Sequence, residues 1–172
     1  QGNSIGLRMS GFNGLSGGAS YVIDGSSVTT LAGNATSVSI EGLVSNVAFV
    51  GPIAGLDGSA YGISAGNNTN AALTFSGLDL SSRWSAGVGI QLRGTGHLVT
   101  GMTSNYRATG YDLRNITGLE VDSSSASRAT TEALRLEASS GVVLRDLALT
   151  QSAAGLNLVS MVGGGLVIGP YS

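Results

Sequence analysis

The residues of this sequence that could do chemistry on a ligand fall into two groups. The first group combines aromatic rings with arginines in three short stretches, SRWSAG (82–87), NYRATG (105–110) and SRATTE (127–132). Aromatic rings stack on sugar faces, and arginine forks hold carboxylates or hydroxyls. The alternative is that the rings cap the core and the arginines lie over them. We predict a glycan-binding flank that consists of Arg83, Trp84, Tyr106, Arg107 and Arg128.

The second group is charged and lies in a more regular part of the chain. If the segments around it are stacked strands, Asp112 faces outward between Gln91 and Arg135. An acid next to an arginine on a neighbouring strand forms an ordinary cross-strand ion pair, which is the interpretation we favour. The alternative is a catalytic role for Asp112 and Arg135. We therefore expect no catalytic residues, with this pair as the alternative.

Metal ions and cofactors find little support in the sequence. Glu120, Asp122 and Asp146 could approach calcium, but that ion takes about six to eight oxygen ligands. Cysteine is absent, which excludes disulfides and thiolate metal sites. His97 is the single histidine, and we expect it on a surface loop beside Gly96 without a catalytic partner. We expect no cofactor, with calcium as the one candidate metal ion.

Composition limits the possible partners. The 172 residues suit one domain, charged residues make up 10%, and the net charge is -2. All eight basic residues are arginines, and they are scattered along the chain instead of forming a basic patch. We therefore expect no nucleic-acid partner. No uninterrupted run of about 18 apolar residues occurs, so we also expect no membrane insertion.

One pattern recurs along the chain and must position these residues. GIQLRGTGHLVTGMT (89–103) is echoed by stretches of the same length from 110, 133 and 155, at spacings of 21, 23 and 22 residues. Each begins with two apolar residues separated by a polar one, which places both apolar side chains on one face of a strand. The four pairs are Ile90 and Leu92, Tyr111 and Leu113, Leu134 and Leu136, and Leu156 and Leu158.

A second apolar cluster follows in each stretch. It places Leu119 with Val121, Val142 with Leu144, and Leu166 with Ile168, and it is weaker at Leu98 and Met102. Stretches from 37 and 62 extend the pattern upstream with longer spacings. The apolar clusters are too short for helical repeats, which need ten or more residues of helical periodicity. We predict a right-handed parallel β-helix of about eight turns, a single domain over residues 1–172 with its clearest repeats in 37–169, in which Gly, Asn and Ser occupy the corners.

The cadence of GYDLRNITGLEVDSS and GVVLRDLAL resembles the parallel β-helix repeat of pectate-lyase-like proteins. That superfamily includes polysaccharide lyases and hydrolases, mannuronan epimerases, autotransporter adhesins and phage tailspikes. The resemblance implies the fold, but the paired aspartates of its hydrolases and the Asp-Pro-His cluster of its epimerases are absent here. It favours a non-catalytic structural or adhesive module, extracellular or on a cell or virion surface. A lyase or depolymerase acting on an acidic glycan is the alternative.

The two ends of such a rod bear on its partners. Open strand edges pair with other chains unless something caps them. We see no amphipathic helix or charged loop at either end, and apolar residues continue almost to the last position. Either the chain is a piece of a longer rod or its ends meet partners. We expect copies of itself, as a trimer or a head-to-tail filament, and possibly a polysaccharide.

Overall fold

The computed structural model describes residues 4–11, 21–24, 28, 34–162 and 165–169. Within them the chain is all-β and contains no helix, so no helix there is long or apolar enough to cross a membrane. The strands stack in parallel on three faces. The first face consists of β1 (Ser4–Ser10), β3 (Ala35–Glu41), β5 (Tyr61–Ala65), the start of β7 (Val88–Thr100), the start of β9 (Thr109–Asp122), β11 (Glu132–Glu137) and β14 (Leu156–Val159).

The other two faces complete each turn. The second face consists of β2 (Tyr21–Asp24), β4 (Ser45–Val50), β6 (Ala71–Ser76), the later parts of β7 and β9, β12 (Ser140–Arg145) and β15 (Leu166–Ile168). The third face is shorter and consists of β8 (Thr103–Asn105), β10 (Ser125–Ser127) and β13 (Ala148–Thr150). The stretch 125–140 contains β10, β11 and the first residue of β12, and no helix.

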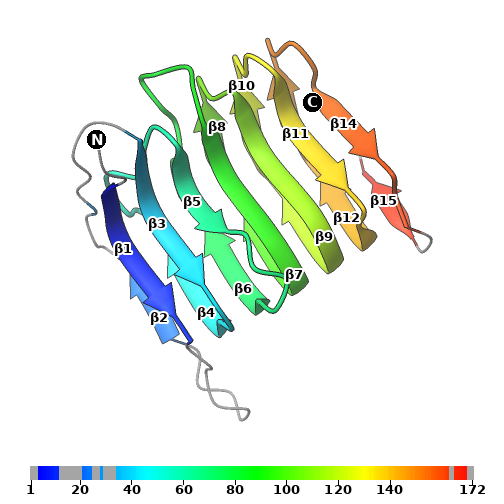
Figure 1. Cartoon of the computed structure of the whole chain (residues 1–172). Helices are drawn as coiled ribbons and strands as arrows, with labels where there is room; N and C mark the ends of the chain where they lie inside the picture. The colour runs from blue at the N-terminus through cyan, green and yellow to red at the C-terminus, as the bar shows by residue number, and fades with distance from the viewer. Residues whose placement is uncertain (1–3, 12–20, 25–27, 29–33, 163–164, 170–172) are drawn as a thin grey trace.

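The chain winds into a parallel β-solenoid of about 6 turns (Figure 1). Near strands run downward in the figure, far strands run upward, and each turn lies to the right of the previous one, so the winding is right-handed. The expected number of about eight turns is too high. The reason is that the early turns are longer: Ser4 lies opposite Ala35 and Tyr61 opposite Val88, whereas Thr109 lies opposite Glu132.

Apolar side chains form continuous columns inside the rod. The predicted inward pairs of the first face are confirmed, since each lies directly opposite its counterpart on the next strand. The same holds for the second face, where the rings of Phe49 and Phe75 stack with centroids 5.3 Å apart. One assignment is wrong: on β7, His97 and Val99 face inward, and Leu98 faces outward opposite Glu120.

A glycine precedes the inward pair in several turns, and the third face explains why. Gly89, Gly110 and Ala133 stack on one another at the point where the third face approaches closely. A Cβ atom at Gly110 would meet the Ala133 carbonyl oxygen and would lie 2.8 Å from the Ala126 Cβ atom. The inward residues of β8 and β10, Ser104 and Ala126, are correspondingly small and fully buried. The glycine of the repeat therefore serves packing.

Corners are made by residues with positive φ, which stack in columns of their own. Five such residues lie between the first and second faces, with φ between 49° and 69°: Asn46, Ala72, Gly96, Gly118 and Gly141. The prediction that Gly, Asn and Ser occupy corners is thus partly confirmed. After the third face the corner residues are Tyr106, Arg128 and Gln151, at φ 56°, 55° and 51°. These large side chains point away from the rod, which makes this corner chemically distinct.

Candidate functional site

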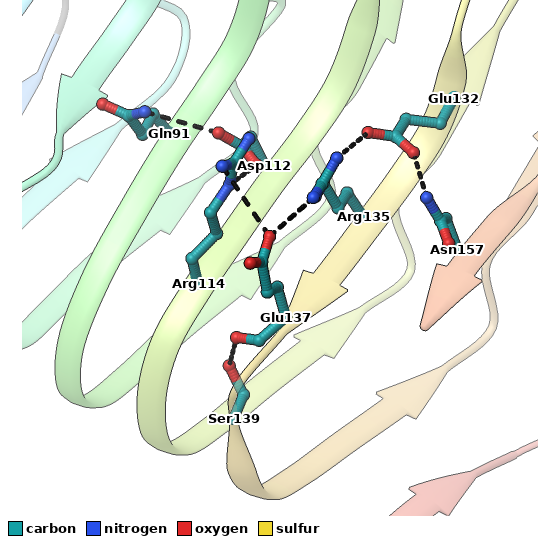
Figure 2. Close-up of polar contacts among 8 residues, drawn as sticks. All are labelled: Gln91, Asp112, Arg114, Glu132, Arg135, Glu137, Ser139 and Asn157. Carbon is teal, nitrogen blue, oxygen red and sulfur yellow. Dashed lines mark hydrogen bonds and ion pairs between the residues drawn. The ribbon is translucent and has the colours of Figure 1, made fainter. Parts of the chain in front are cut away.

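Outward positions of the first face carry a connected set of charged side chains (Figure 2). Gln91, Asp112, Arg135 and Asn157 lie opposite one another on successive strands, as predicted. The Asp112 carboxylate accepts hydrogen bonds from Arg114 Nε at 2.5 Å and from Gln91 Nε2 at 3.3 Å. Only 2% of Asp112 is exposed. Its two oxygens are therefore covered by neighbours from its own strand and the preceding one.

Arg135 is paired differently from what we expected. Its guanidinium donates to Glu137 at 2.7 Å and lies 3.5 Å from Glu132, so its ion pairs are with acids of its own strand and not with Asp112. The Arg135 hydrogen bond lowers the pKa of the Glu137 carboxyl below its usual value. Asn157 Nδ2 donates to Glu132 from the next turn. The cross-strand pair predicted between Asp112 and Arg135 is therefore replaced by an ion pair along each strand, Arg114 with Asp112 and Arg135 with Glu137. A longer cross-strand contact of 3.7 Å joins Arg114 to Glu137.

This pairing limits the chemistry that the first face can do. A general base needs an accessible carboxylate, and a general acid needs one whose pKa is raised. Asp112 is almost fully buried, and Arg135 holds Glu137 in its ionised form. The geometry favours a structural set of ion pairs over the alternative catalytic role for Asp112 and Arg135.

The aromatic corner, which we define as Arg83, Trp84, Tyr106, Arg128 and Gln151, is the more open of the two predicted groups. Trp84 is 61% exposed and Tyr106 is 40% exposed. The Arg128 guanidinium lies over the Tyr106 ring, 4.9 Å from its centroid, and its Nε donates to Gln151 at 3.0 Å. Backbone hydrogen bonds between successive turns stack Tyr106, Arg128 and Gln151 along the rod. The corner thus offers aromatic faces and a guanidinium to solvent.

Arg107 does not belong to this surface, and its assignment to the glycan-binding flank is wrong. The side chain is 0% exposed and points into the rod. It donates to the carbonyl oxygens of Leu80, Gly58 and Leu56 at 2.6, 2.5 and 2.9 Å. Burial lowers its pKa to about 10, which keeps it charged at neutral pH. Arg107 therefore ties its own turn to the preceding turns.

A shallow hollow lies beside the aromatic corner. It measures about 340 Å³, and its polar lining comes from Asp57, Asp79, Ser81 and Arg83. Arg83 lies 3.5 Å from Asp57 and belongs to both the hollow and the corner. Sequence reasoning did not identify Asp57 or Asp79, because their segments lie outside the regular repeats. The hollow adds hydrogen-bonding groups next to the aromatic surface.

A second hollow of about 520 Å³ lies on the first face, where the early turns meet a longer loop. Its polar lining consists of hydroxyls, amides and one carboxylate, from Ser39, Glu41, Ser64, Asn67 and Asn68. The Glu41 carboxylate is already bound by the Ser39 hydroxyl and by Arg8. The polar run GNNTN (66–70) was the available sequence signal for this hollow.

His97 lies in the core, so its predicted place on a surface loop is wrong. It is 3% exposed and occupies the column of Leu73 and Leu119. Nδ1 accepts a hydrogen bond from the Leu73 amide at 3.2 Å, and Nε2 lies 3.1 Å from the Arg93 carbonyl oxygen. This pairing requires the neutral ring with its proton on Nε2. Burial lowers the pKa of His97 to about 4, which agrees with a neutral ring.

The acids considered for calcium do not converge. Glu120 is paired with Arg145 at 2.9 Å, and Asp122 accepts a hydrogen bond from the Ser123 hydroxyl. Within the residues that the structure describes, no group of three or more His, Cys, Asp or Glu side chains could hold a metal ion.

The last described turn exposes side chains that belong to the interior columns. Leu158 stacks on Leu136, and Ile168 stacks on Leu144. Leu136 and Leu144 are 0% exposed, whereas Leu158 and Ile168 are 43% and 37% exposed. Val162 and Val167 add further exposed apolar surface at the same end. In the last described turn the interior columns are therefore open to solvent.

Comparisons with protein-family models, curated proteins and solved structures give no match to this chain. Its class follows from its own geometry: it is a parallel β-solenoid with a triangular arrangement of faces. That architecture agrees with the resemblance to β-helix proteins at the level of the fold.

Proposed function

We propose that this protein is a non-catalytic structural or adhesive module that assembles with copies of itself through the ends of its rod and binds glycans along the aromatic corner. An extracellular or virion-surface location is part of the proposal, since polymeric glycans are met there. The observation that carries it is the exposure of Leu158 and Ile168 in columns whose interior members are fully buried. Leaving apolar surface in water costs about 25 cal/mol per Å², so a chain that covers this end stabilises it.

The assembly is tested by measuring the particle mass with light scattering across a dilution series. We expect a mass well above the 17.1 kDa of one chain at high concentration. The double variant Leu158→Lys, Ile168→Lys should be a monomer, because burying an unpaired charge at the contact is costly. Leu43→Lys is the matched control, since Leu43 is 46% exposed on an interior turn. A monomer for the unaltered chain at every concentration overturns the proposal.

Glycan binding rests on a separate observation, the exposure of the Trp84 and Tyr106 rings, with the Arg128 guanidinium 4.9 Å from the centroid of the Tyr106 ring. Titration calorimetry with neutral and acidic oligosaccharides measures it directly. We expect Trp84→Ala to weaken binding by about tenfold or more, as the loss of a stacked aromatic pair would. Leu43→Ala is the control, because Leu43 is 46% exposed on an interior turn and belongs neither to this corner nor to the rod end. If new reducing ends appear during the titration, the protein cleaves the oligosaccharide, and the proposal of a non-catalytic module is overturned.

A further inference from the structure

The two ends of the rod carry strands of the same direction in the same columns. Within the described residues, β1 and β2 pair along one edge only, with β3 and β4. At the other end β14 and β15 also pair along one edge only, with β11 and β12. All four pairings are parallel. Within the described chain, the unpaired edge of β14 and β15 therefore matches β1 and β2 in strand direction and in the order of the faces.

Inward side chains match across such a contact. The column that begins with Leu7 on the first face ends with Leu156, and Met9 and Leu158 lie two residues further along their strands. On the second face the column that begins with Ile23 ends with Ile168. Leu7, Met9 and Ile23 are only partly buried. The apolar inward side chains of the two ends thus lie in the same columns and would pack on one another if the ends met.

We propose that this chain binds a second copy head to tail, with β1 and β2 of one copy adding to β14 and β15 of the next. The proposal rests on the self-assembly proposed above and specifies its contact. The inward columns then run on from copy to copy. Because the contact joins two different surfaces without closing, it generates a filament.

A tail-to-tail contact between two C-terminal ends fits less well. A two-fold axis perpendicular to the rod would pair β14 with its own copy in the antiparallel direction. The same rotation would bring the second face of one copy against the third face of the other. The strands of the third face, such as β13, have three residues and their own inward pattern. Only the head-to-tail arrangement continues both long faces.

Single-cysteine variants test the contact, because the natural sequence contains no cysteine. Arg8 and Asn157 occupy the first and last described positions of one outward column on the first face. Neighbouring strands lie about 4.8 Å apart, which is within the range of Cα separations that a disulfide spans. Mixing Arg8→Cys with Asn157→Cys under mild oxidation should give about tenfold more covalent dimer than either variant alone. Far-UV circular dichroism checks that both variants fold.

Controls separate this contact from assembly in general. Ser64→Cys lies mid-rod in the same column and should give no dimer with either end variant. A second pair, Ser10→Cys with Val159→Cys, lies two residues further along the same strands and should repeat the result. Asn157→Cys dimers that form as readily alone as in the mixture would mean a tail-to-tail contact, which overturns the head-to-tail proposal and keeps self-assembly. Oligomers in light scattering that give no cross-link in the mixture would also overturn the head-to-tail proposal and keep self-assembly. A monomer in light scattering at every concentration overturns both self-assembly and the head-to-tail contact. Something other than a second copy would then have to cover the exposed end of the rod.

Discussion

Arg107 shows at the scale of a single residue how a charged side chain can hold successive turns of a solenoid together. Its fully buried guanidinium donates hydrogen bonds to the carbonyl oxygens of Leu56, Gly58 and Leu80. Arg107→Met keeps much of the volume but leaves these carbonyls without their donor. Since each lost bond to a buried charged group costs about 1.5–3 kcal/mol, we expect a loss of at least 3 kcal/mol in the free energy of unfolding.

Urea unfolding followed by circular dichroism measures this loss. Arg128→Met is the matched control. Arg107 follows β8, and Arg128 follows β10 on the next turn, but the Arg128 side chain is exposed. Its substitution should change the free energy of unfolding by less than about 0.5 kcal/mol. Equal losses for the two variants would contradict the role assigned to Arg107.

His97 gives the rod a pH dependence of its own. Its pKa is about 4 in the folded chain, below the usual histidine value of 6.5, because the ring is buried. The unfolded chain therefore binds a proton first as the pH falls, so stability is complete above pH 6.5 and is lost progressively toward pH 4. The full loss from this residue is about 3 kcal/mol. Measured between pH 7 and 4, His97→Gln should show a shallower decline than the natural protein, and parallel curves for the two would refute the assignment.

At the scale of the strand, the glycine at the head of the repeat is predicted to matter only where the third face lies against it. Gly110→Ala places a methyl group against the Ala133 carbonyl and the Ala126 side chain. Overpacking of this kind costs about 1–3 kcal/mol. Gly155 occupies the same column one turn after Ala133, and a Cβ atom there lies 3.9 Å from its nearest neighbours. Gly155→Ala should therefore be tolerated, and thermal unfolding of the two variants provides the comparison.

The strands also show what the sequence could predict. Alternating apolar pairs such as Leu134 and Leu136 identified the inward columns, because burial on one face of a strand imposes a period of two. The assignment failed on β7, where the register shifts between Leu92 and Gly94 and moves Leu98 outward. Arg107 and His97 could not be recognised as interior residues. Their burial depends on carbonyl and amide groups of other turns, which the local pattern does not contain.

At the scale of the whole molecule, the rod is a series of turns in which each contacts mainly its neighbours. Stability in such an array is the sum of local terms and of the interfaces between turns. β9 pairs with β7 on one side and with β11 and β12 on the other, whereas β14 and β15 each have a single partner within the described chain. The end turns are thus expected to open more readily than the middle of the rod.

This gradient makes self-assembly visible at the level of single amides. In dilute protein, the amides of β14 and β15 should exchange with deuterium about 100-fold faster than those of β9, a difference of roughly 3 kcal/mol in opening free energy. At concentrations where copies associate, exchange in β14, β15 and β1 should slow by about tenfold or more while β9 stays unchanged, since pairing at the ends removes their free edges. Hydrogen exchange with mass spectrometry at two concentrations measures both effects. Exchange at β14 and β15 that does not depend on concentration would show that these edges stay unpaired.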